Sequence, residues 1–176
     1  MLKGELVTLR PIRLNDWEKT IQWRNDMRNK TSNLSHPFPI TEEQEQLWYK
    51  NKVESYDNSF IPFIIVENVS GESVGFMNLI SIDWINRHCF VGGTVGAKVN
   101  QGKGYGKEAV ALLVKYAFSN LNLNKVYAHV LETHPAMKSW VDLGAKIEGA
   151  LKEHAYIKGK YENVCVLAWY PNFELK

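Results

Sequence analysis

The chain has 176 residues, which suits a single domain spanning residues 1–176. Hydrophobic residues make up 45% and charged residues 23% of it, a balance that provides a full core and argues against intrinsic disorder. The formal charge of +2 is too small an excess to indicate a nucleic-acid or membrane partner. Because no apolar run approaches the roughly 20 residues of a membrane helix, and Met1–Arg10 lacks the apolar stretch of a signal peptide, we expect a cytoplasmic protein.

The chain begins with a predicted strand and a predicted helix. The strand is expected at Leu6–Arg10, where β-forming residues dominate. Asn15 followed three residues later by Glu18 is a capping-box pattern, in which a side chain at the helix start and one in its first turn bond each other's backbone. This pattern predicts a helix from Asp16 to Arg24.

A second capping-box pattern, Thr41 with Gln44, predicts another helix, which carries Leu47, Trp48 and Val53. The segment Asn25–Pro39 between the two helices contains two prolines and several polar residues. Prolines interrupt regular structure, so this segment is expected to be a loop or a broken helix.

The rest of the chain alternates strands with two helices. Apolar residues at 110, 113, 114, 117 and 121 recur on one helical face and predict a helix over Gly104–Asn120. Ala136–Leu143 is a shorter predicted helix with Gly144 at its C-cap, and Lys158–Lys160 is a hairpin turn. Strands are expected at Phe60–Val66, Val74–Ile82, His88–Val99, Lys125–Leu131, Ala145–Leu151, His154–Ile157 and Tyr161–Tyr170. The order β-α-α-β-β-β-α-β-α-β-β predicts a mixed α/β layer fold.

Three alternating glycines, at positions 102, 104 and 106, lie between a predicted strand and the start of a predicted helix. Glycine lets the backbone approach a ligand, and the free N–H groups of a helix's first turn favour an anion. The dinucleotide fingerprint GxGxxG is excluded because Lys107 occupies its last glycine position. The phosphate loop GxxxxGK[ST] is excluded because Gln101 and Glu108 occupy two of its defining positions.

Gln101-x-x-Gly104-x-Gly106 matches the [Gln/Arg]-x-x-Gly-x-[Gly/Ala] motif of the GNAT superfamily of N-acetyltransferases. The string Gln101–Ala109 resembles the branch that holds ribosomal-protein alanine N-acetyltransferases and spermidine N-acetyltransferases. The resemblance covers most of the chain, with further landmarks at Leu9–Pro11, Trp23–Asp26, Gly75, Leu121–Tyr127, Leu143–Gly144, Glu148–Gly149 and Ile157–Tyr161.

The resemblance implies a GNAT fold, a splayed and mostly antiparallel central sheet with helices on both faces. The strand around Thr94–Val99 and the strand Lys125–Leu131 would diverge, with the pantetheine arm of acetyl-CoA between them. The arm would pair with the backbone of Thr94, Val95 and Gly96. The pyrophosphate would lie on the loop formed by Gln101, Gly102, Lys103, Gly104, Tyr105, Gly106 and Lys107. Lys103 and Lys107 either add charge there or are solvated surface lysines.

Three positions depart from the family pattern. Thr133 occupies the position of an Asn that usually helps hold the cofactor arm. Trp140 occupies the position of a Tyr that protonates the departing thiolate in relatives; an indole N–H only donates hydrogen bonds, so Trp140 is expected to pack against cofactor or core. Phe90 replaces a Glu base. His88 shares the face of Phe90 by strand alternation, and is either a substitute base or a residue at the rim.

The implied reaction is direct acetyl transfer from acetyl-CoA to a primary amine, without an acyl-enzyme and without a metal. Cys89 and Cys165 lack the His/Asp partners that would mark a nucleophile in the sequence, and no Cys/His ligand spacing exists. Without a strong base, the site suits an α-amine of pKa about 8 or a weakly basic amino sugar better than a polyamine amine of pKa about 10.4. The acceptor classes left open are a protein N-terminal amine and a small amine, such as a polyamine, aminoglycoside or amino-sugar nucleotide. A CoA-binding regulatory module without catalysis is the alternative.

The acceptor is expected to enter between the N-terminal helices and the last hairpin. Aromatic side chains there could line its site or belong to the core, and the chief candidates are Trp23, Trp48 and Tyr156. A cationic acceptor could be held by acidic residues that are otherwise solvated, namely Asp26, Glu42, Glu43, Glu45 and Asp83. Since members of the family are often dimers or larger, a homodimer or larger homo-oligomer is also expected.

Overall fold

The computed structural model describes residues 1–55 and 57–172. In chain order these residues form β1 Leu2–Lys3, β2 Val7–Pro11, a 3-10 turn Leu14–Asp16, α1 Trp17–Asn25, α2 Met27–Ser32, α3 Glu42–Glu54, β3 Ile61–Glu67, β4 Ser73–Asp83, β5 His88–Val95, a 3-10 turn Lys98–Asn100, α4 Tyr105–Ser119, β6 Lys125–Leu131, α5 Ala136–Asp142, β7 Lys146–Ile157 and β8 Lys160–Trp169. Among them, no helix is long and apolar enough to cross a membrane.

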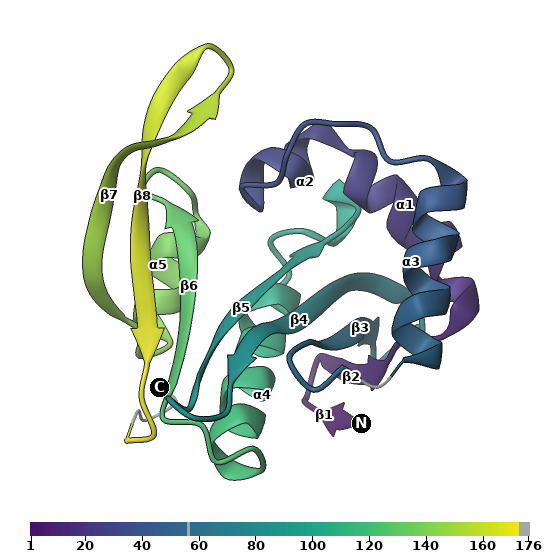
Figure 1. The fold of residues 1–176 in the computed structure, drawn as a ribbon, viewed down its shortest axis with the longest axis horizontal. Coiled ribbons are helices and arrows are strands. Elements are labelled where there is room, and N and C mark those ends of the chain that lie inside the picture. The colour runs from purple at the N-terminus through teal and green to yellow at the C-terminus, as the bar shows by residue number, and fades with distance from the viewer. Residues whose placement is uncertain (56, 173–176) are drawn as a thin grey trace.

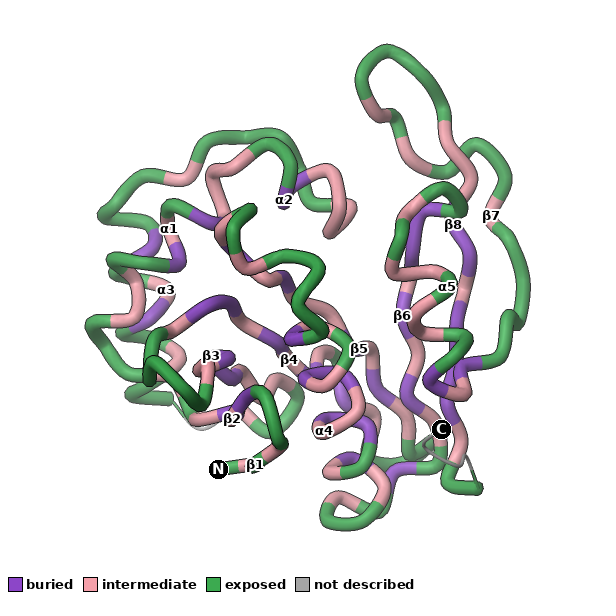
Figure 2. Tube along the Cα trace, turned by 180° about the vertical axis from the view of Figure 1, so that it is seen from behind, coloured by how far each residue is buried: buried purple, intermediate pink, exposed green. Residues whose placement is uncertain are grey.

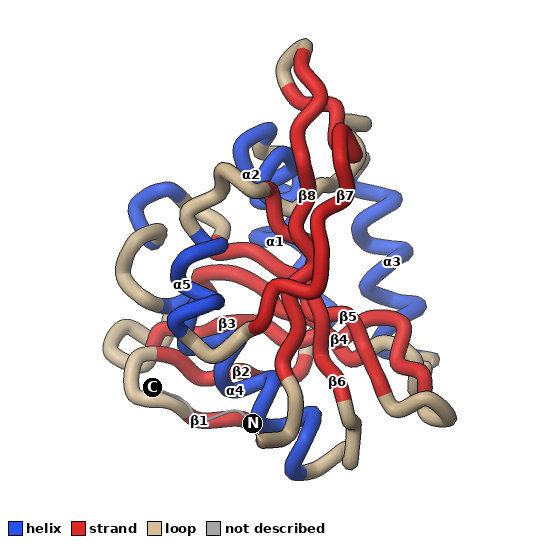
Figure 3. The backbone as a smooth tube through the Cα atoms, turned by 90° about the vertical axis from the view of Figure 1, so that its left-hand side faces the viewer, coloured by secondary structure: helices blue, strands red, loops and turns tan. Residues whose placement is uncertain are grey.

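The strands form one mixed sheet in the order β1-β2-β3-β4-β5-β6-β8-β7 (Figure 1). β5 and β6 pair in parallel, and the other neighbouring strands of the described chain pair antiparallel. Figure 3 shows α5 and α3 on opposite sides of the strands. The expected mostly antiparallel α/β fold with helices on both faces is therefore confirmed.

Helix α4 supplies the core of one face. Its apolar stripe, predicted from the helical period, is buried at Val110, Leu113, Val114 and Ala117, which pack with inward residues of β2, β4, β5 and β6. Figure 2 shows that buried segments gather in the central strands, whereas β7 is largely exposed along the edge of the sheet. The central strands are thus the fixed frame on which the remaining elements are placed.

Two expected boundaries were wrong. β5 ends at Val95 and not at Val99, because the chain turns there into a 3-10 turn in which the Gln101 N–H donates to the Lys98 carbonyl at 3.1 Å. Asn15 lies inside a 3-10 turn and does not cap α1. Asp16 has that place, and its carboxylate accepts the Arg13 N–H at 2.7 Å.

The second capping box is confirmed. Thr41 Oγ1 accepts the Gln44 N–H at 3.3 Å, and Gln44 Oε1 accepts the Thr41 N–H at 3.0 Å. The broken segment before it contains α2, and β1 adds a short edge strand that was not predicted. The two strands expected before the last turn form one strand, β7, whose register shifts between Leu151 and Ala155 around Glu153, a residue with a positive φ of 50°.

Glu108, in the first turn of α4, ties this helix to the start of the sheet. Its carboxylate accepts the backbone N–H groups of Glu5, Leu6 and Val7 at 2.8, 2.9 and 2.7 Å. An anion at this helix end is also favoured by the helix dipole. The glycine loop that precedes α4 is therefore fixed relative to β2 by a side chain from the helix itself.

We expect Glu108→Ala to lower the free energy of unfolding by about 2 to 3 kcal/mol, because three backbone donors lose a charged acceptor while two of them can turn to water. Urea denaturation measures this change. Lys115→Ala, an exposed position on the same helix, is the control and should leave the unfolding midpoint unchanged. Equal midpoints for both variants would contradict the anchoring role.

Candidate functional site

The central strands β5 and β6 separate partway along their length. Their parallel pairing covers His88 to Phe90 of β5 and stops there. Beyond that point β5 continues along β4, whereas β6 follows β8 as far as Leu131. The two strands therefore diverge toward the end of β5 (Figure 1), and the region between their backbones is called the wedge below. The stretch of β5 at its wide end consists of Thr94 and Val95, with Gly96 directly after it.

The glycine loop follows β5 and leads into α4. Gly102 and Gly104 have φ angles of 78° and 87°, the left-handed region that favours glycine. Gly104 is the N-cap of α4 and offers no side chain to bond the first turn. The N–H groups of that turn and the positive end of the helix dipole are thus available to an anion. Lys103 and Lys107 are exposed at its rim, while Tyr105 is buried.

Asn29 of α2 braces the end of β5. Its Nδ2 donates to the Gly96 carbonyl at 3.0 Å and to the Trp23 carbonyl at 2.9 Å. Gln101 Nε2 donates to the Val95 carbonyl at 3.1 Å. A Cβ on Gly96 would lie 2.2 Å from the Trp23 ring, so this position must be glycine for the ring to pack there. Asn29 was not among the predicted site residues, because only the folded chain brings it to β5.

A cavity of about 630 Å³ lies on the face of the sheet opposite α4. Residues of α1, α2, α3 and the loop before α3 form its roof, and β3, β4 and β5 form its floor. Its walls include the expected Trp23 and Trp48, with the rings of Phe60, Phe76 and Phe90. Because Phe90, where the wedge begins, is part of this floor, the cavity adjoins the wedge.

Among the described residues, Glu45 is the one expected acid that lines this cavity. It is fully buried, and its oxygens accept from Thr20 Oγ1 at 2.8 Å and from Arg24 Nη1 at 2.5 Å. Arg24 also lies over the Trp48 ring, 5.5 Å from its centroid. Glu45 is therefore already satisfied by two partners inside the protein.

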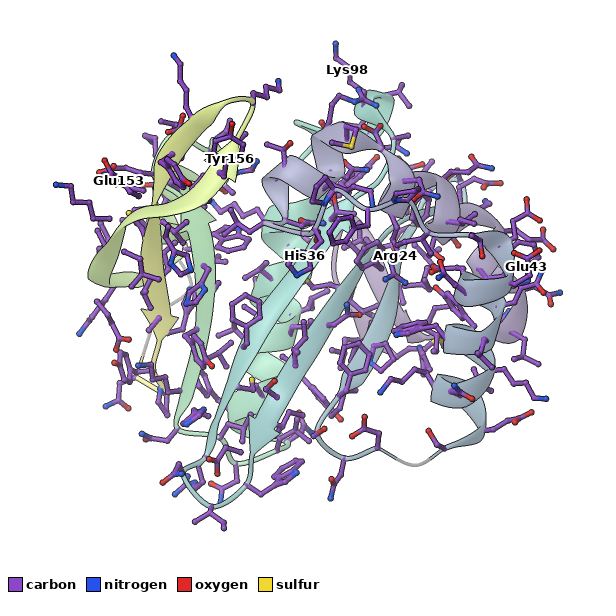
Figure 4. All side chains as sticks on the ribbon, turned by 45° about the horizontal axis from the view of Figure 1, so that its top comes forward. Arg24, His36, Glu43, Lys98, Glu153 and Tyr156 are labelled. Carbon is purple, nitrogen blue, oxygen red and sulfur yellow. The ribbon has the colours of Figure 1, made fainter. Side chains whose placement is uncertain are left out.

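The other acids lie elsewhere. Asp26 caps α2 and pairs with Arg28, which lowers the pKa of its carboxyl. Asp83 accepts the N–H groups of Ile85 and Asn86 in the turn between β4 and β5, at the closed end of the wedge. Figure 4 shows Glu43 directed outward from α3, whereas Arg24 and His36 lie between the helices and the sheet.

The remaining candidates are spread over the molecule. His88 is at the closed end of the wedge, with Nε2 3.9 Å from Asp83 Oδ2. Tyr156 is 67% exposed on the β7–β8 hairpin, where its ring lies 5.1 Å from that of Tyr161. Trp140 packs against the core with its ring 5.7 Å from that of Trp169. Thr133 is exposed in the turn after β6, on the far wall of the wedge.

A histidine that sequence analysis missed lies where the wedge opens. His129 of β6 has its ring centroid 5.4 Å from that of Phe90. Burial, and to a smaller extent the charge of His154, lowers its pKa, so the imidazole is neutral near pH 7 and can accept a proton. The signal was available in the alternation of the predicted strand, which places His129 on the same face as Tyr127.

Neither cysteine is available as a nucleophile. Cys89 is fully buried in the core, and burial raises the pKa of its thiol to about 12. Cys165 is 4% exposed, and burial together with Glu132 raises its pKa as well. Since the thiolate is the reactive form, both side chains are inert near neutral pH.

Comparison with known proteins gives the same assignment over nearly the whole chain. A family model described as an acetyltransferase (GNAT) domain matches residues 7–140. The spermidine N(1)-acetyltransferase of Vibrio cholerae serotype O1 is 28% identical over 163 residues, covering 90% of this chain and 89% of the relative. The uncharacterized N-acetyltransferase p20 of Bacillus licheniformis is 28% identical over 165 residues, covering 93% and 92% of the two chains.

Solved structures resemble the fold closely. A Vibrio cholerae spermidine N-acetyltransferase in complex with CoA and spermine superposes with a TM-score of 0.88 at 24% identity, covering 97% of this chain and 98% of that one. A dodecameric structure of spermidine N-acetyltransferase from the same organism gives a TM-score of 0.79 at 26% identity, covering 96% and 95%. The likeness extends over nearly the full length of this chain and of both solved chains.

We expect Glu45→Ala to lower the free energy of unfolding by about 3 kcal/mol, because it leaves the Arg24 charge without its buried partner. Glu43→Ala, on the exposed side of the same helix, is the matched control and should lower the unfolding midpoint much less, because Glu43 is exposed in the first turn and has no ion-pair partner among the described residues. Thermal and urea unfolding of both variants measure the difference. An unchanged free energy of unfolding in Glu45→Ala would show that the ion pair between Glu45 and Arg24 does not stabilise the fold.

Proposed function

Because the chain belongs to the GNAT acetyltransferase family, we propose that it is an acetyl-CoA-dependent N-acetyltransferase that moves an acetyl group directly to a primary amine. The observation that carries this proposal is the wedge between β5 and β6, with an anion-binding loop at its mouth and a cavity beside it. Acetyl-CoA supplies the acetyl group as a thioester, and the cavity supplies a place for the amine.

The wedge and the loop suit the two ends of the donor. The backbone of Thr94, Val95 and Gly96 lies at the wide end of the wedge and would pair with the amide groups of a pantetheine arm through groups other than the Val95 and Gly96 carbonyls, which accept hydrogen bonds from Gln101 and Asn29. The first-turn N–H groups after Gly104 suit a pyrophosphate, with Lys103 and Lys107 adding charge at the rim. A relative solved with CoA at a TM-score of 0.88 supports this placement.

The residues around the wedge suit direct transfer. Holding the amine beside the thioester supplies much of the rate, and backbone N–H groups of β5 stabilise the oxyanion. The neutral amine nitrogen forms the new C–N bond, the C–S bond breaks and releases the CoA thiolate, and the proton that the nitrogen loses passes to neutral His129 and from there, through solvent, to the thiolate. Because Cys89 and Cys165 are buried thiols, no acyl-enzyme is formed.

The proposal leaves the acceptor as a small amine or a protein N-terminal amine. Relatives named spermidine N(1)-acetyltransferases make spermidine the first polyamine to test. The proposal also includes a homo-oligomer, supported by the dodecameric structure of a relative, and a cytoplasmic location, where acetyl-CoA is consumed. A CoA-binding module without turnover is the alternative.

The test for acetyl transfer is an assay of the free CoA thiol released with each of three acceptors: spermidine, glucosamine and a peptide with an N-terminal alanine. Mass spectrometry then shows whether each acceptor is acetylated. We expect acetylation of at least one amine. Gly104→Val should abolish CoA binding, because a branched side chain is strained at a φ of 87° and intrudes where backbone meets phosphate.

Gly71→Val is the matched control, since Gly71 has a φ of 71° in a turn between β3 and β4 and has no atom within 4 Å of an added Cβ. It imposes similar backbone strain and should leave CoA binding intact. Normal CoA affinity in a folded Gly104→Val protein would refute the assigned loop. Binding of acetyl-CoA without turnover of any amine would instead establish the regulatory module.

His129→Gln should lower kcat about 100-fold, the usual contribution of a general base. Because burial lowers the pKa of His129 below its ordinary 6.5, the wild-type rate should fall only as pH drops below that value, and this acid limb should vanish in the variant. His88→Gln, at the closed end of the wedge, should change kcat less than about threefold. The reverse pattern in the two variants would assign the base to His88.

A further inference from the structure

The cavity has an excess of positive charge. Its charged walls are Arg24, Lys30 and Glu45. The carboxylate of Glu45 pairs with Arg24 at 2.5 Å and accepts from Thr20, so these two charges offset each other. Among the described charged residues that line the cavity, Lys30 is the one whose charge is not balanced by an ion pair.

Lys30 is a buried residue whose ammonium, partly buried, has no counterion in the described chain. Its side chain comes from α2, and the residue is only 4% exposed. Nζ donates one hydrogen bond, to the Phe38 carbonyl at 2.7 Å, and no carboxylate of residues 1–55 and 57–172 forms an ion pair with it. An ammonium has three donors, so two remain. Burial, with the nearby Arg24 charge, lowers the pKa of Lys30, as expected for a charge that lacks compensation.

From these contacts we infer that the acetyl acceptor is a small amine that also carries an anionic group, a phosphate or a carboxylate, which Lys30 binds. This inference rests on the proposed acetyltransferase function and narrows its acceptor. A buried charge is stable when it is paired, and a bound oxyanion supplies the missing pair.

The same walls disfavour a polyamine. A polycation entering this cavity meets Lys30 and Arg24, and the carboxylate that could receive it, Glu45, is fully buried and already bonded. Asp26 pairs with Arg28, and Glu43 points outward (Figure 4). The described part of the cavity thus offers no unpaired acid to a cationic acceptor.

The cavity size and its apolar walls suit a ring of moderate size with a charged substituent. A volume of about 630 Å³ is ample for a monosaccharide or amino-acid-sized ligand. The rings of Trp48, Phe60 and Phe90 offer flat apolar surfaces beside the charged roof. The amine would lie toward Phe90, where the wedge begins, and the anion toward Lys30 in α2.

Matched acceptors test the inference. The first pair is glucosamine and glucosamine 6-phosphate, which differ only in the phosphate. The second set is ethanolamine, O-phosphoethanolamine and β-alanine, which separates a phosphate from a carboxylate. We expect kcat/KM for at least one anionic member to exceed that of its neutral match by about tenfold or more, mainly through KM, as for one charge-assisted hydrogen bond.

Lys30→Met should bring that ratio to within about threefold of unity, whereas Lys30→Arg should keep most of it. Lys30→Gln retains a donor for the Phe38 carbonyl and serves if the Met variant does not fold. Lys138→Met, an exposed lysine of α5, is the control and should keep the wild-type ratio. Circular dichroism confirms that each variant is folded.

Spermidine or a neutral amine outperforming every anionic acceptor would overturn the inference and leave the proposed function standing. An anionic preference that survives in folded Lys30→Gln would also overturn it. If acetyl-CoA binds but no amine is acetylated, the proposed function fails. Calorimetry with glucosamine 6-phosphate then tests the anion site independently of turnover. Binding that is lost in Lys30→Gln supports the anion site, and equal or absent binding in both proteins refutes it.

Discussion

The separation of β5 and β6 is the constraint on which the rest of the structure depends. Both strands begin as a parallel pair, but β6 continues along β8 and β5 along β4. The end of β5 is held on its own side by Asn29 and by the packing of Trp23 on Gly96. Rings of Phe90 and His129 fill the point of divergence. A sheet that leaves backbone unpaired in this way needs a ligand or water to satisfy it.

Charge is distributed differently on the two sides of this opening. At its mouth, the first turn of α4 has backbone donors that suit an anion, and Glu108 in the same turn ties the helix to the start of the sheet. In the cavity, the one carboxylate of the described lining forms an ion pair with Arg24, and Lys30 has a carbonyl partner but no carboxylate partner. Both ligands inferred for this protein are therefore bound through their negative groups, although the reaction itself concerns an amine.

Local signals predicted the parts of the molecule that are encoded locally. The apolar period of α4, the capping box at Thr41 and the glycine spacing each depend on residues within a few positions of one another. The end of β5 at Val95 was missed because Asn29, distant in sequence, bonds the Gly96 carbonyl there, and the chain then enters a 3-10 turn. Lys30 and His129 were missed because burial and pairing decide their chemistry, and neither can be read from spacing. The divergence of β5 and β6 was expected only from the resemblance to a family, because no local sequence pattern indicates it.

Hydrogen–deuterium exchange with and without CoA tests the central claim most directly, since it reports which backbone amides a bound ligand covers. The account predicts slower exchange at residues 94–96 and 101–107, with the exposed β7–β8 hairpin as an internal reference that changes little. Protection confined to the hairpin or to the outer helices, under conditions where CoA is bound, would contradict the assignment of the wedge and its loop as the donor site.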